Sequence, residues 1–337
     1  MVSTSASQAE DAGSIPVICS ITLEKSGVFF LGGFFMKLYL YGMILASNSF
    51  RLNEFVKPDE YSEIEESYRF VGGETGAAAT ILSSLGAEIV LDGNHIGRNV
   101  APLLKSFYKD KPVNMDSVYF DENYDGLEDY ILISGDMRTP FGHFGHYFRE
   151  AFNGGFRHWN KPKESDIAGC DTAAIDPFFG EESELAAEFC VKHGKPYVTI
   201  DCKYDSFMHK NSAVSVISGE FIRGSYPNMT REELFTLYAE NGNGLTVITN
   251  GGKRFFYGRR GEEMKSFEPY KVNVVSTLGA GDSFKAGCTY ALSKGMSDDD
   301  IVKFASACAG ACISRYPMQI DPPTLGDIEG IISSENR

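Results

Sequence analysis

The stretch from Val275 to Gly287, VSTLGAGDSFKAG, holds the residues whose types and spacing are best suited to chemistry. We interpret it as the end of a strand, a turn at Gly279, Ala280 and Gly281, and the first turn of a helix that carries Asp282. Small residues let the backbone approach a ligand closely, and the free N–H groups of a helix start bind anions. An aspartate at that point can take a proton from a hydroxyl while the N–H groups hold a phosphoryl group in transit.

An ordinary structural explanation also exists for the Gly-Ala-Gly-Asp sequence. It is a plain glycine turn in which Asp282 only caps the following helix. The strand pattern before the turn, the Ser-Phe-x-Ala-Gly continuation and the small residues of the downstream helix favour a functional role instead. We therefore take this segment as the leading candidate for a catalytic, anion-binding site.

The segments around this turn alternate between strand and helix patterns. Apolar runs predict strands at residues 37–46, 173–176, 196–201, 213–218 and 245–250, with further strand material at 255–258 and 268–276. Periodicity, caps and glycine stops predict helices at residues 73–85, 181–193, 230–240 and 283–294, and from 298 onward. This alternation predicts a three-layer α/β sandwich with a mainly parallel central sheet that binds ligands at the carboxyl ends of its strands.

Two polar, aromatic segments do not follow that alternation. Residues 47–71 and 116–135 show strand-like patterns, and we expect them to form a small β-sheet lid appended to the larger fold. Exposed sheet edges pair readily, so the lid is a candidate surface for a homodimer. No long linker interrupts residues 36–330, which we interpret as one domain followed by a tail at 331–337.

Composition limits the classes of partner. The chain of 337 residues has 31 basic and 46 acidic side chains, a formal net charge of −15. A surface this acidic repels phosphate backbones and anionic lipid, so we expect no nucleic-acid or membrane partner. The seven cysteines are odd in number and include no C-x-x-C pair, which favours reduced thiols in a cytoplasmic protein. Residues 1–35 lack the basic start of a targeting peptide, and we expect an extension outside the fold.

The signature segment resembles the G-A-G-D-S-F-x-A-G motif of the ribokinase-like sugar kinases, the phosphofructokinase B family. Further landmarks follow in the family's order, namely Gly42, Pro58, the pair Gly72-Gly73, Thr249-Asn-Gly-Gly252, Arg315-Tyr-Pro and Asp321-Pro-Pro. The resemblance covers about residues 36–330. It implies a ribokinase-like fold with a lid, and a phosphotransferase that uses ATP and Mg²⁺ to phosphorylate a hydroxyl of a small sugar or sugar-like substrate.

The resemblance also implies roles for individual residues. Asp282 matches the general base, and Gly279, Ala280 and Gly281 match the anion hole for the γ-phosphate. The positions that match the nucleotide site are Thr249, Gly251, Gly252 and Ser306. The positions assigned to the acceptor are Asn48, Gly72, Gly73 and Arg138. Glu220 matches the glutamate that orders Mg²⁺ through water.

Several residues typical of the family are replaced. The substitutions are Ser47 or Asn48 for the sugar-binding aspartate, Ala77 and Ile217 for two asparagines, and Ser276 for the aspartate that heads the signature. They leave two alternatives open: a nucleoside kinase of the same fold, and a ligand-binding paralogue with little turnover. In many family members that aspartate helps to hold K⁺, so the neutral Ser276 predicts weak or absent K⁺ activation. Its hydroxyl can instead bond to the backbone of the turn.

Weaker signals allow two interpretations each. The segment from Arg138 to His146 is either a substrate loop or a surface loop after the lid. His143 and His146 are spaced as half a metal site, but the sequence places no third ligand. Trp159 could stack on a sugar, although a role as an anchor of its loop is favoured. Cys308 and Cys312 lie one helical turn apart among small residues, which indicates buried thiols rather than a zinc site.

Overall fold

The computed structural model describes residues 36–135 and 137–334, and its largest element is a nine-stranded sheet. In order across the sheet the strands are β15 (Lys265–Phe267), β14 (Phe255–Gly258), β13 (Leu245–Ile248), β12 (Val214–Ile217), β11 (Tyr197–Ile200), β10 (Thr172–Ile175), β1 (Lys37–Gly42), β4 (Glu88–Gly93) and β6 (Val113–Asn114). All neighbours from β13 to β6 are parallel, and only the β13–β14 and β14–β15 pairs are antiparallel. The expected mainly parallel sheet is confirmed.

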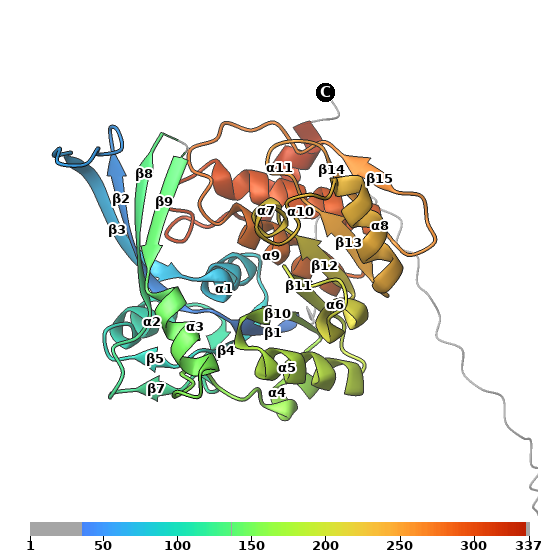
Figure 1. Ribbon diagram of the computed structural model, residues 1–337, viewed down its shortest axis with the longest axis horizontal. Helices are drawn as coiled ribbons and strands as arrows, with labels where there is room; N and C mark the ends of the chain where they lie inside the picture. Colours follow the sequence, from blue (N-terminus) through green and yellow to red (C-terminus); the bar gives the residue numbers. More distant parts are fainter. Residues whose placement is uncertain (1–35, 136, 335–337) are drawn as a thin grey trace, which may run out of the picture. The chain divides into compact units, whose positions relative to one another are not determined.

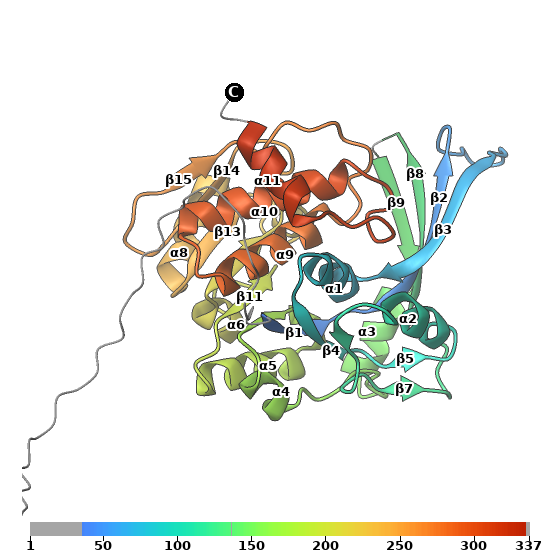
Figure 2. The ribbon, with the colours of Figure 1, turned by 180° about the vertical axis from the view of Figure 1, so that it is seen from behind.

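Helices cover both faces of this sheet, as Figures 1 and 2 show from opposite sides. The helices packed in the core cluster of one face are α1 (Glu74–Ser84), α2 (Ala101–Tyr108), α9 (Ala280–Ser293), α10 (Asp298–Ile313) and α11 (Leu325–Ser334). The other face carries α3 (Phe144–Phe152), α4 (Glu164–Ala168), α5 (Glu181–Lys192), α6 (Phe207–Asn211), α7 (Gly219–Ser225) and α8 (Arg231–Asn241), with a 3₁₀ turn at Pro177–Phe179.

The central strand β1 shows why the two faces are both apolar. Leu38 and Leu40 lie in the core shared with α1, α9 and α10, whereas Tyr39 and Tyr41 lie in the core shared with α5. All four side chains are buried. Alternate side chains of a strand point to opposite faces, so a strand with helices on both sides is apolar without interruption.

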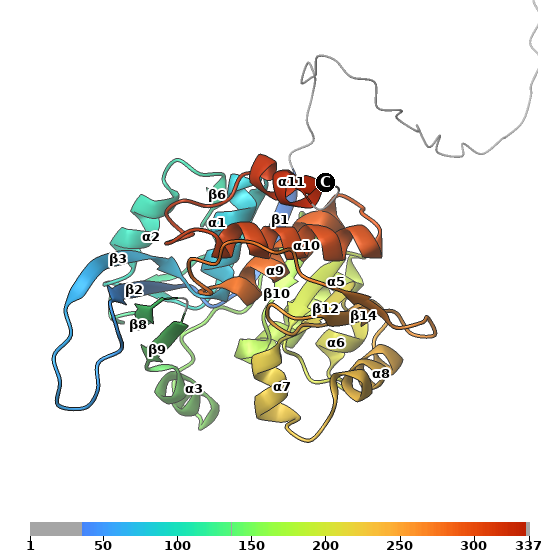
Figure 3. The ribbon, with the colours of Figure 1, turned by 90° about the horizontal axis from the view of Figure 1, so that it is seen from above.

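A smaller four-stranded sheet stands at one edge of the main sheet (Figure 3). Its order is β3 (Ile64–Gly72), β2 (Leu45–Leu52), β8 (Glu128–Ser134) and β9 (Met137–Gly142). A separate two-stranded ribbon pairs β5 (Ile96–Gly97) with β7 (Phe120–Asp121). The expected small sheet is present. However, the strand expected at 37–46 divides at Met43 and Ile44 into β1 of the large sheet and β2 of the small one.

The small sheet also reaches further along the chain than residues 116–135. Its fourth strand, β9, runs to Gly142, so Arg138 lies on a strand of the small sheet rather than in a loop after it. The polar sequence of β9 is typical of a loop, which is why the strand was not expected there. The 116–127 part of the predicted segment instead carries β7 and turns.

Three further boundaries differ from those expected from the sequence. Residues 268–276 are not a strand, because Val272 and Val274 line a cavity and the amides of Val275 and Ser276 bond to Ile313 O at 2.8 and 3.1 Å. Helix α9 begins at Ala280, three residues before the predicted start. In addition, α11 continues to Ser334, into the segment expected to be a tail.

Other expectations concern single side chains. Trp159 is buried and anchors its loop, since Nε1 donates to Glu182 Oε2 at 3.1 Å and the indole stacks on Phe179. Cys308 and Cys312 are buried thiols within α10. The expectation for residues 1–35 lies outside the described residues. Over the part of the chain that is described, no helix is both long and apolar enough to cross a bilayer.

Candidate active site

The turn before α9 places Asp282 in the first turn of that helix. Gly279 precedes the helix with φ 73°, a left-handed conformation that glycine adopts without the cost of a Cβ atom. Ser276 is buried, and its Oγ accepts a hydrogen bond from Leu278 N at 3.3 Å. The hydroxyl thus bonds to the backbone of the turn. As a result, the turn is ordered by its own side chain and the helix start faces a cavity.

A second helix start, that of α1, faces the same space. Gly73 precedes α1 with φ 79°, and a Cβ atom there would lie 2.4 Å from Met43 O. That carbonyl accepts hydrogen bonds from Thr75 N and Gly76 N at 3.1 and 3.3 Å. Glu74 is the first residue of the helix. The Gly-Gly pair therefore lets the chain pass close to Met43 and directs an unexpected carboxylate, Glu74, towards Asp282.

A buried ion pair lies beneath these two helix starts. Lys285 Nζ donates to Asp176 Oδ1, and both side chains are almost fully buried. Thr75 Oγ1 donates to Asp176 Oδ2 at 2.8 Å. Asp176 follows β10, Thr75 belongs to α1 and Lys285 to α9, so the pair connects three elements. A buried pair of this kind fixes geometry, because removal of one partner would leave an uncompensated charge.

The carboxyl groups around this space perturb one another. Burial raises the pKa of Asp282, while the positive charges of Lys285 and Arg138 oppose that rise. Burial, followed by the charges of Asp282 and Asp176, raises the pKa of Glu74 to about 8. The raised pKa favours the protonated form of Glu74, which can donate a hydrogen bond. Asp282 keeps the cationic neighbours that favour its ionised form.

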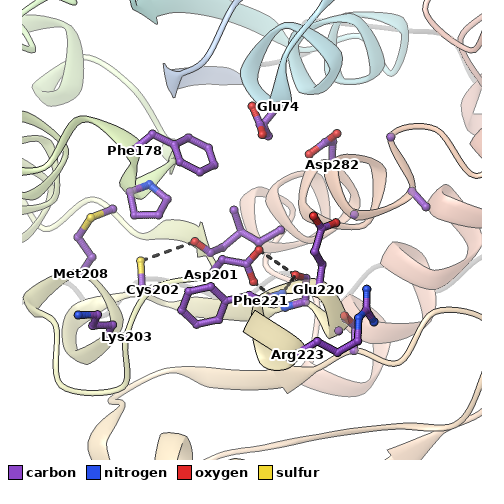
Figure 4. Close-up of a pocket in the computed structure, with 18 of the residues that line it drawn as sticks. Glu74, Phe178, Asp201, Cys202, Lys203, Met208, Glu220, Phe221, Arg223 and Asp282 are labelled. Atoms are coloured by element: carbon purple, nitrogen blue, oxygen red, sulfur yellow. Dashed lines mark hydrogen bonds between the residues drawn. The ribbon is translucent and has the colours of Figure 1, made fainter. Parts of the chain in front are cut away.

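Three cavities meet at the carboxyl ends of the parallel strands. Cavity A, of about 900 Å³, is lined by Asp201, Glu220, Gly281 and Asp282 among others (Figure 4). Cavity B, of about 390 Å³, lies between the small sheet and the two helix starts. Cavity C, of about 470 Å³, lies between β12, β13 and α10. Residues common to A and B are Glu74, Arg138, Phe178, Glu220, Gly279 and Asp282.

Cavity B receives part of the acceptor set expected from the sequence. Gly72, Gly73 and Arg138 line it, but Asn48 does not. Asn48 lies opposite Arg69 on β3 and Tyr130 on β8, on the other face of the small sheet. Ser47 takes the cavity position instead, because strand neighbours alternate between faces. Asn48 therefore lies outside the lining of cavity B, and Ser47 is the residue of this strand pair that lines it.

Cavity C receives the expected nucleotide set. Its lining includes Thr249, Gly251, Gly252, Ser306 and the helix start at Ala280 and Gly281. The rest of the wall is mostly apolar, with residues such as Val216, Val272, Phe255 and Phe284. Arg138 lines all three cavities, and its Nη1 donates to Thr277 O at 2.8 Å. The structure therefore gathers the predicted acceptor, signature and nucleotide segments around adjoining spaces.

Glu220 lies in the first turn of α7 and lines both cavities A and B. Ser218 caps that helix, accepting from Phe221 N at 3.1 Å, and donates through Oγ to Asp201 Oδ2 at 2.8 Å. Figure 4 shows Asp201 and Glu220 on the side of cavity A across from Glu74, with Asp282 nearby. Carboxylate oxygens of this kind are the ligands preferred by Mg²⁺.

Sequence reasoning missed four polar residues of this region: Glu74, Asp129, Asp176 and Lys285. Asp129 pairs in register with Ser47 across β2 and β8 and lines cavity B. Its Oδ1 is buried without a hydrogen-bond partner, and burial raises its pKa to about 6. Glu74, next to the noted Gly-Gly pair, could have been found from its position. Asp129 and Asp176 depend on strand register, which no local pattern reveals.

Comparison with the sequences of known proteins gives matches over part of the chain. Residues 220–325 match the model of the pfkB family carbohydrate kinases. The 5-dehydro-2-deoxygluconokinase of Listeria innocua is 32% identical over 112 residues, 33% of this chain and 33% of its own. Its namesake from Bacillus subtilis is 31% identical over 93 residues, 27% of this chain and 28% of its own. The match thus spans about a third of the length of these curated relatives.

Solved structures are similar over nearly the whole described fold. A proposed ribokinase of Agrobacterium tumefaciens has a TM-score of 0.77 at 18% identity and covers 90% of this chain and 99% of its own. Arabidopsis thaliana ribokinase complexed with ribose and ATP scores 0.72 at 16% identity, covering 88% and 99%. The nucleoside kinase of Methanocaldococcus jannaschii scores 0.70 at 17% identity, covering 90% and 100%.

These comparisons confirm the resemblance that the signature predicted. The described residues have the fold of the ribokinase-like kinases, a mainly parallel sheet between helix layers with a smaller separate sheet. The stretch 220–325, which contains Glu220, Thr249 and the signature itself, is similar to the pfkB family carbohydrate kinases.

Proposed function

We propose that this protein is an ATP-dependent kinase that phosphorylates a hydroxyl of a small sugar or sugar-like alcohol. The observation that carries the proposal is the position of Asp282. It lies in the first turn of α9, lines both cavities A and B, and adjoins a helix start that also lines cavity C. A hydroxyl in B and a phosphoryl donor reaching from C would meet at this helix start.

In the proposed reaction Asp282 accepts the proton of the acceptor hydroxyl while that oxygen attacks the γ-phosphorus of ATP in line. The bond from the γ-phosphorus to the β,γ-bridging oxygen breaks, and ADP leaves. A base is most effective when its pKa approaches the working pH, and burial raises the pKa of Asp282 in that direction. Ala280 N donates to Thr277 O at 3.3 Å, and the next amides of the α9 start, at Gly281 and Asp282, would stabilise the charge on the transferring group.

Cavity C is the proposed nucleotide site. Its apolar wall suits a flat heterocyclic base, and Gly251 and Gly252 leave the backbone open to phosphate oxygens. Gly251 has φ 60°, so a side chain there would be strained. Ser306, on α10, supplies a hydroxyl to the same space.

The residues present fit a magnesium ion. Glu220 and Asp201 present oxygen donors in cavity A, between the proposed acceptor and nucleotide sites. Mg²⁺ bound there through water would neutralise charge on the ATP phosphates. Glu220 is the residue we expect to hold it, because Ser218 already donates two hydrogen bonds to Asp201.

The lining of cavity B favours a neutral, hydroxyl-rich acceptor. Ser47 and Asp129 lie side by side in register, and the raised pKa of Glu74 favours its protonated form. Together they offer donors and acceptors for several hydroxyls. Asp129 thus supplies a carboxylate at the place where Ser47 replaces the family's sugar-binding aspartate.

A nucleoside is the second candidate acceptor. Three aromatic side chains, Phe144, Phe148 and Phe178, line cavity B opposite the polar group. Aromatic faces can stack on a nucleobase as well as on the apolar face of a sugar ring. Structural similarity to nucleoside kinases extends over the fold, which supports keeping this alternative.

ATP consumption across a panel of sugars, sugar acids and nucleosides tests the proposal. The panel includes 5-dehydro-2-deoxygluconate, after the relatives' name, with ribose, fructose, adenosine and inosine. An acceptor-dependent rise in ADP that Asp282→Asn abolishes and Asp110→Asn, an exposed control, leaves intact supports a kinase. Binding of ATP without any acceptor-dependent turnover would support the ligand-binding paralogue instead.

A further inference from the structure

A second group of metal-ligand side chains lies outside the three cavities. His95 connects β4 to β5, Asp121 ends β7, and His158 lies between α3 and α4. Each offers a ligand atom, and these three atoms all lie within 4.8 Å of one another. None of the three residues lines cavity A, B or C. Among the residues that the structure describes, this is the one such triple of histidine, cysteine or acidic side chains.

Backbone contacts hold the three side chains together. His95 N donates to His158 O at 2.8 Å, next to a bridge between Asn94 and Trp159. The β5–β7 pair then sets Gly97 opposite Asp121 in register. Figures 1 and 2 show this ribbon beside α3, close to the base of the small sheet. The cluster is thus fixed by three separate segments of the chain rather than by one flexible loop.

One ring nitrogen of each histidine lacks a hydrogen-bond partner. The Nδ1 atoms of His95 and His158 are both buried without a partner, and His95 is only 8% exposed. An unsatisfied buried polar atom costs free energy, so two together call for a ligand that the protein groups do not supply. Asp121 is oriented beside them, because its Oδ1 accepts from Asn123 N at 2.9 Å.

We propose that His95, Asp121 and His158 bind one Zn²⁺ ion, with water completing a tetrahedral site. Imidazole nitrogen and carboxylate oxygen are common zinc ligands at about 2.0–2.2 Å, which places tetrahedral ligand atoms roughly 3.3–3.5 Å apart. A small rotation of the partly exposed Asp121 side chain towards the two imidazoles would bring the separation closer to that value.

The surroundings of the cluster suit a bound ion. The His158 ring stacks on Tyr124 with centroids 4.1 Å apart, and the His95 ring meets Tyr119 edge-on at 4.7 Å. These rings limit rotation of the imidazoles and exclude part of the solvent, as the outer shell of a metal site does. The ion would connect the segment after α3 to the β5–β7 ribbon through its ligands. Because Phe144 and Phe148 of α3 line cavity B, this connection would also support that wall.

Zinc titration of the full chain, freed of metal by a chelator, tests this inference without using activity. Calorimetry should give one equivalent of Zn²⁺ per chain, and the ion should raise the unfolding temperature. His158→Ala and the milder Asp121→Asn should each weaken binding by at least tenfold and remove the thermal shift. The matched control, His143→Ala/His146→Ala, removes two exposed histidines and should bind as the parent does.

Cobalt absorption separates this site from the cysteines. Co²⁺ bound by two imidazoles and a carboxylate gives weak visible bands, whereas thiolate ligands add strong near-ultraviolet charge-transfer bands. The proposal predicts the first spectrum, lost in His158→Ala and in Asp121→Asn. The absence of a stoichiometric site in the parent, binding that both variants retain, or a thiolate spectrum would each overturn it. Should His158→Ala fail to fold, Asp121→Asn decides the question.

Discussion

Arg138 of the small sheet donates a hydrogen bond through Nη1 to the backbone oxygen of Thr277, at 2.8 Å, in the turn before α9. This contact joins two segments 139 residues apart. It also sets a guanidinium beside Asp282, where its charge lowers the pKa of that carboxyl against the effect of burial. The small sheet thereby reaches the residues proposed to carry out phosphoryl transfer.

Replacing Arg138 should therefore impair the reaction more than the fold. Arg138→Ala removes the contact to Thr277 and a positive charge near the transferring group, so we expect kcat/KM to fall by about 10–100-fold, from the loss of roughly 1.4–2.8 kcal/mol of transition-state stabilisation. The side chain is exposed, and the unfolding midpoint should barely change. Steady-state kinetics beside Arg98→Ala, an exposed arginine at the β5 end, provide the comparison. Equal values of kcat/KM in Arg138→Ala and Arg98→Ala would contradict a role for Arg138 in the reaction.

Glu74 makes stability depend on pH in a defined direction. Its pKa of about 8 in the folded protein lies above its ordinary value of 4.5. Between pH 4.5 and pH 8 the folded state holds a proton on Glu74 that the unfolded state releases. The free energy of unfolding therefore falls as the pH rises through this range, and this loss of stability is complete above pH 8.

The glutamine of Glu74→Gln cannot ionise, so this variant should not lose stability in this way as the pH rises. Relative to the parent, its free energy of unfolding should increase between pH 5 and pH 9 by on the order of 4 kcal/mol. Urea unfolding at several pH values measures the difference. Glu240→Gln, on the exposed side of α8, is the control and should follow the parent. A constant difference between Glu74→Gln and the parent across this range would contradict the assigned protonation.

The Lys285–Asp176 pair predicts a non-additive pair of mutations. Lys285→Met leaves the fully buried Asp176 carboxylate without its counter-charge and should destabilise the protein by about 3–5 kcal/mol. Adding Asp176→Asn removes that charge and keeps an acceptor for Thr75, so the double variant should be more stable than Lys285→Met alone. Urea midpoints of Lys285→Met, Asp176→Asn and the double variant measure this. A double variant as unstable as the sum of the two single ones would show that the charges act independently.

Ser276 predicts the response to monovalent cations. Its Oγ bonds to Leu278 N at 3.3 Å and orders the turn without an ion, and a neutral hydroxyl is a weak ligand for K⁺. Replacing K⁺ with a large organic cation at constant ionic strength should change the initial rate by less than tenfold. Ser276→Ala should lower the rate in either salt. Activation by K⁺ of tenfold or more, about 1.4 kcal/mol, would contradict this account.

Local patterns predicted those parts of the fold that local physics determines. The capping box at Thr230 and Glu233 correctly marked α8, and the apolar runs marked the buried parallel strands. The strand predicted at residues 268–276 was wrong, because the valines of this segment line a cavity rather than pair in a sheet. At the division of β1 from β2, the Met43 carbonyl accepts hydrogen bonds from Thr75 N and Gly76 N of α1, contacts that the sequence does not reveal.

The candidate site was predictable where a motif is continuous in sequence. Gly279 to Asp282 were found because the residues are adjacent, and the structure gathers Thr249 and Ser306 near them. Ser47 rather than its neighbour Asn48 lines cavity B, because a shift of one residue along a strand reverses the face. The positions of Asp129 and of the His95–Asp121–His158 cluster depend on strand register and on contacts between distant segments. Residue spacing in the sequence therefore does not predict them.

The turnover of Asp282→Asn tests the central claim most directly. The substitution keeps the size of the side chain in the first turn of α9, so the variant should fold and bind ATP as the parent does. Without a carboxylate to accept the proton, kcat with the acceptor found in the panel should fall by roughly 10²–10⁴-fold. A variant that binds ATP normally and turns over within a few-fold of the parent would contradict the assignment of Asp282 as the general base.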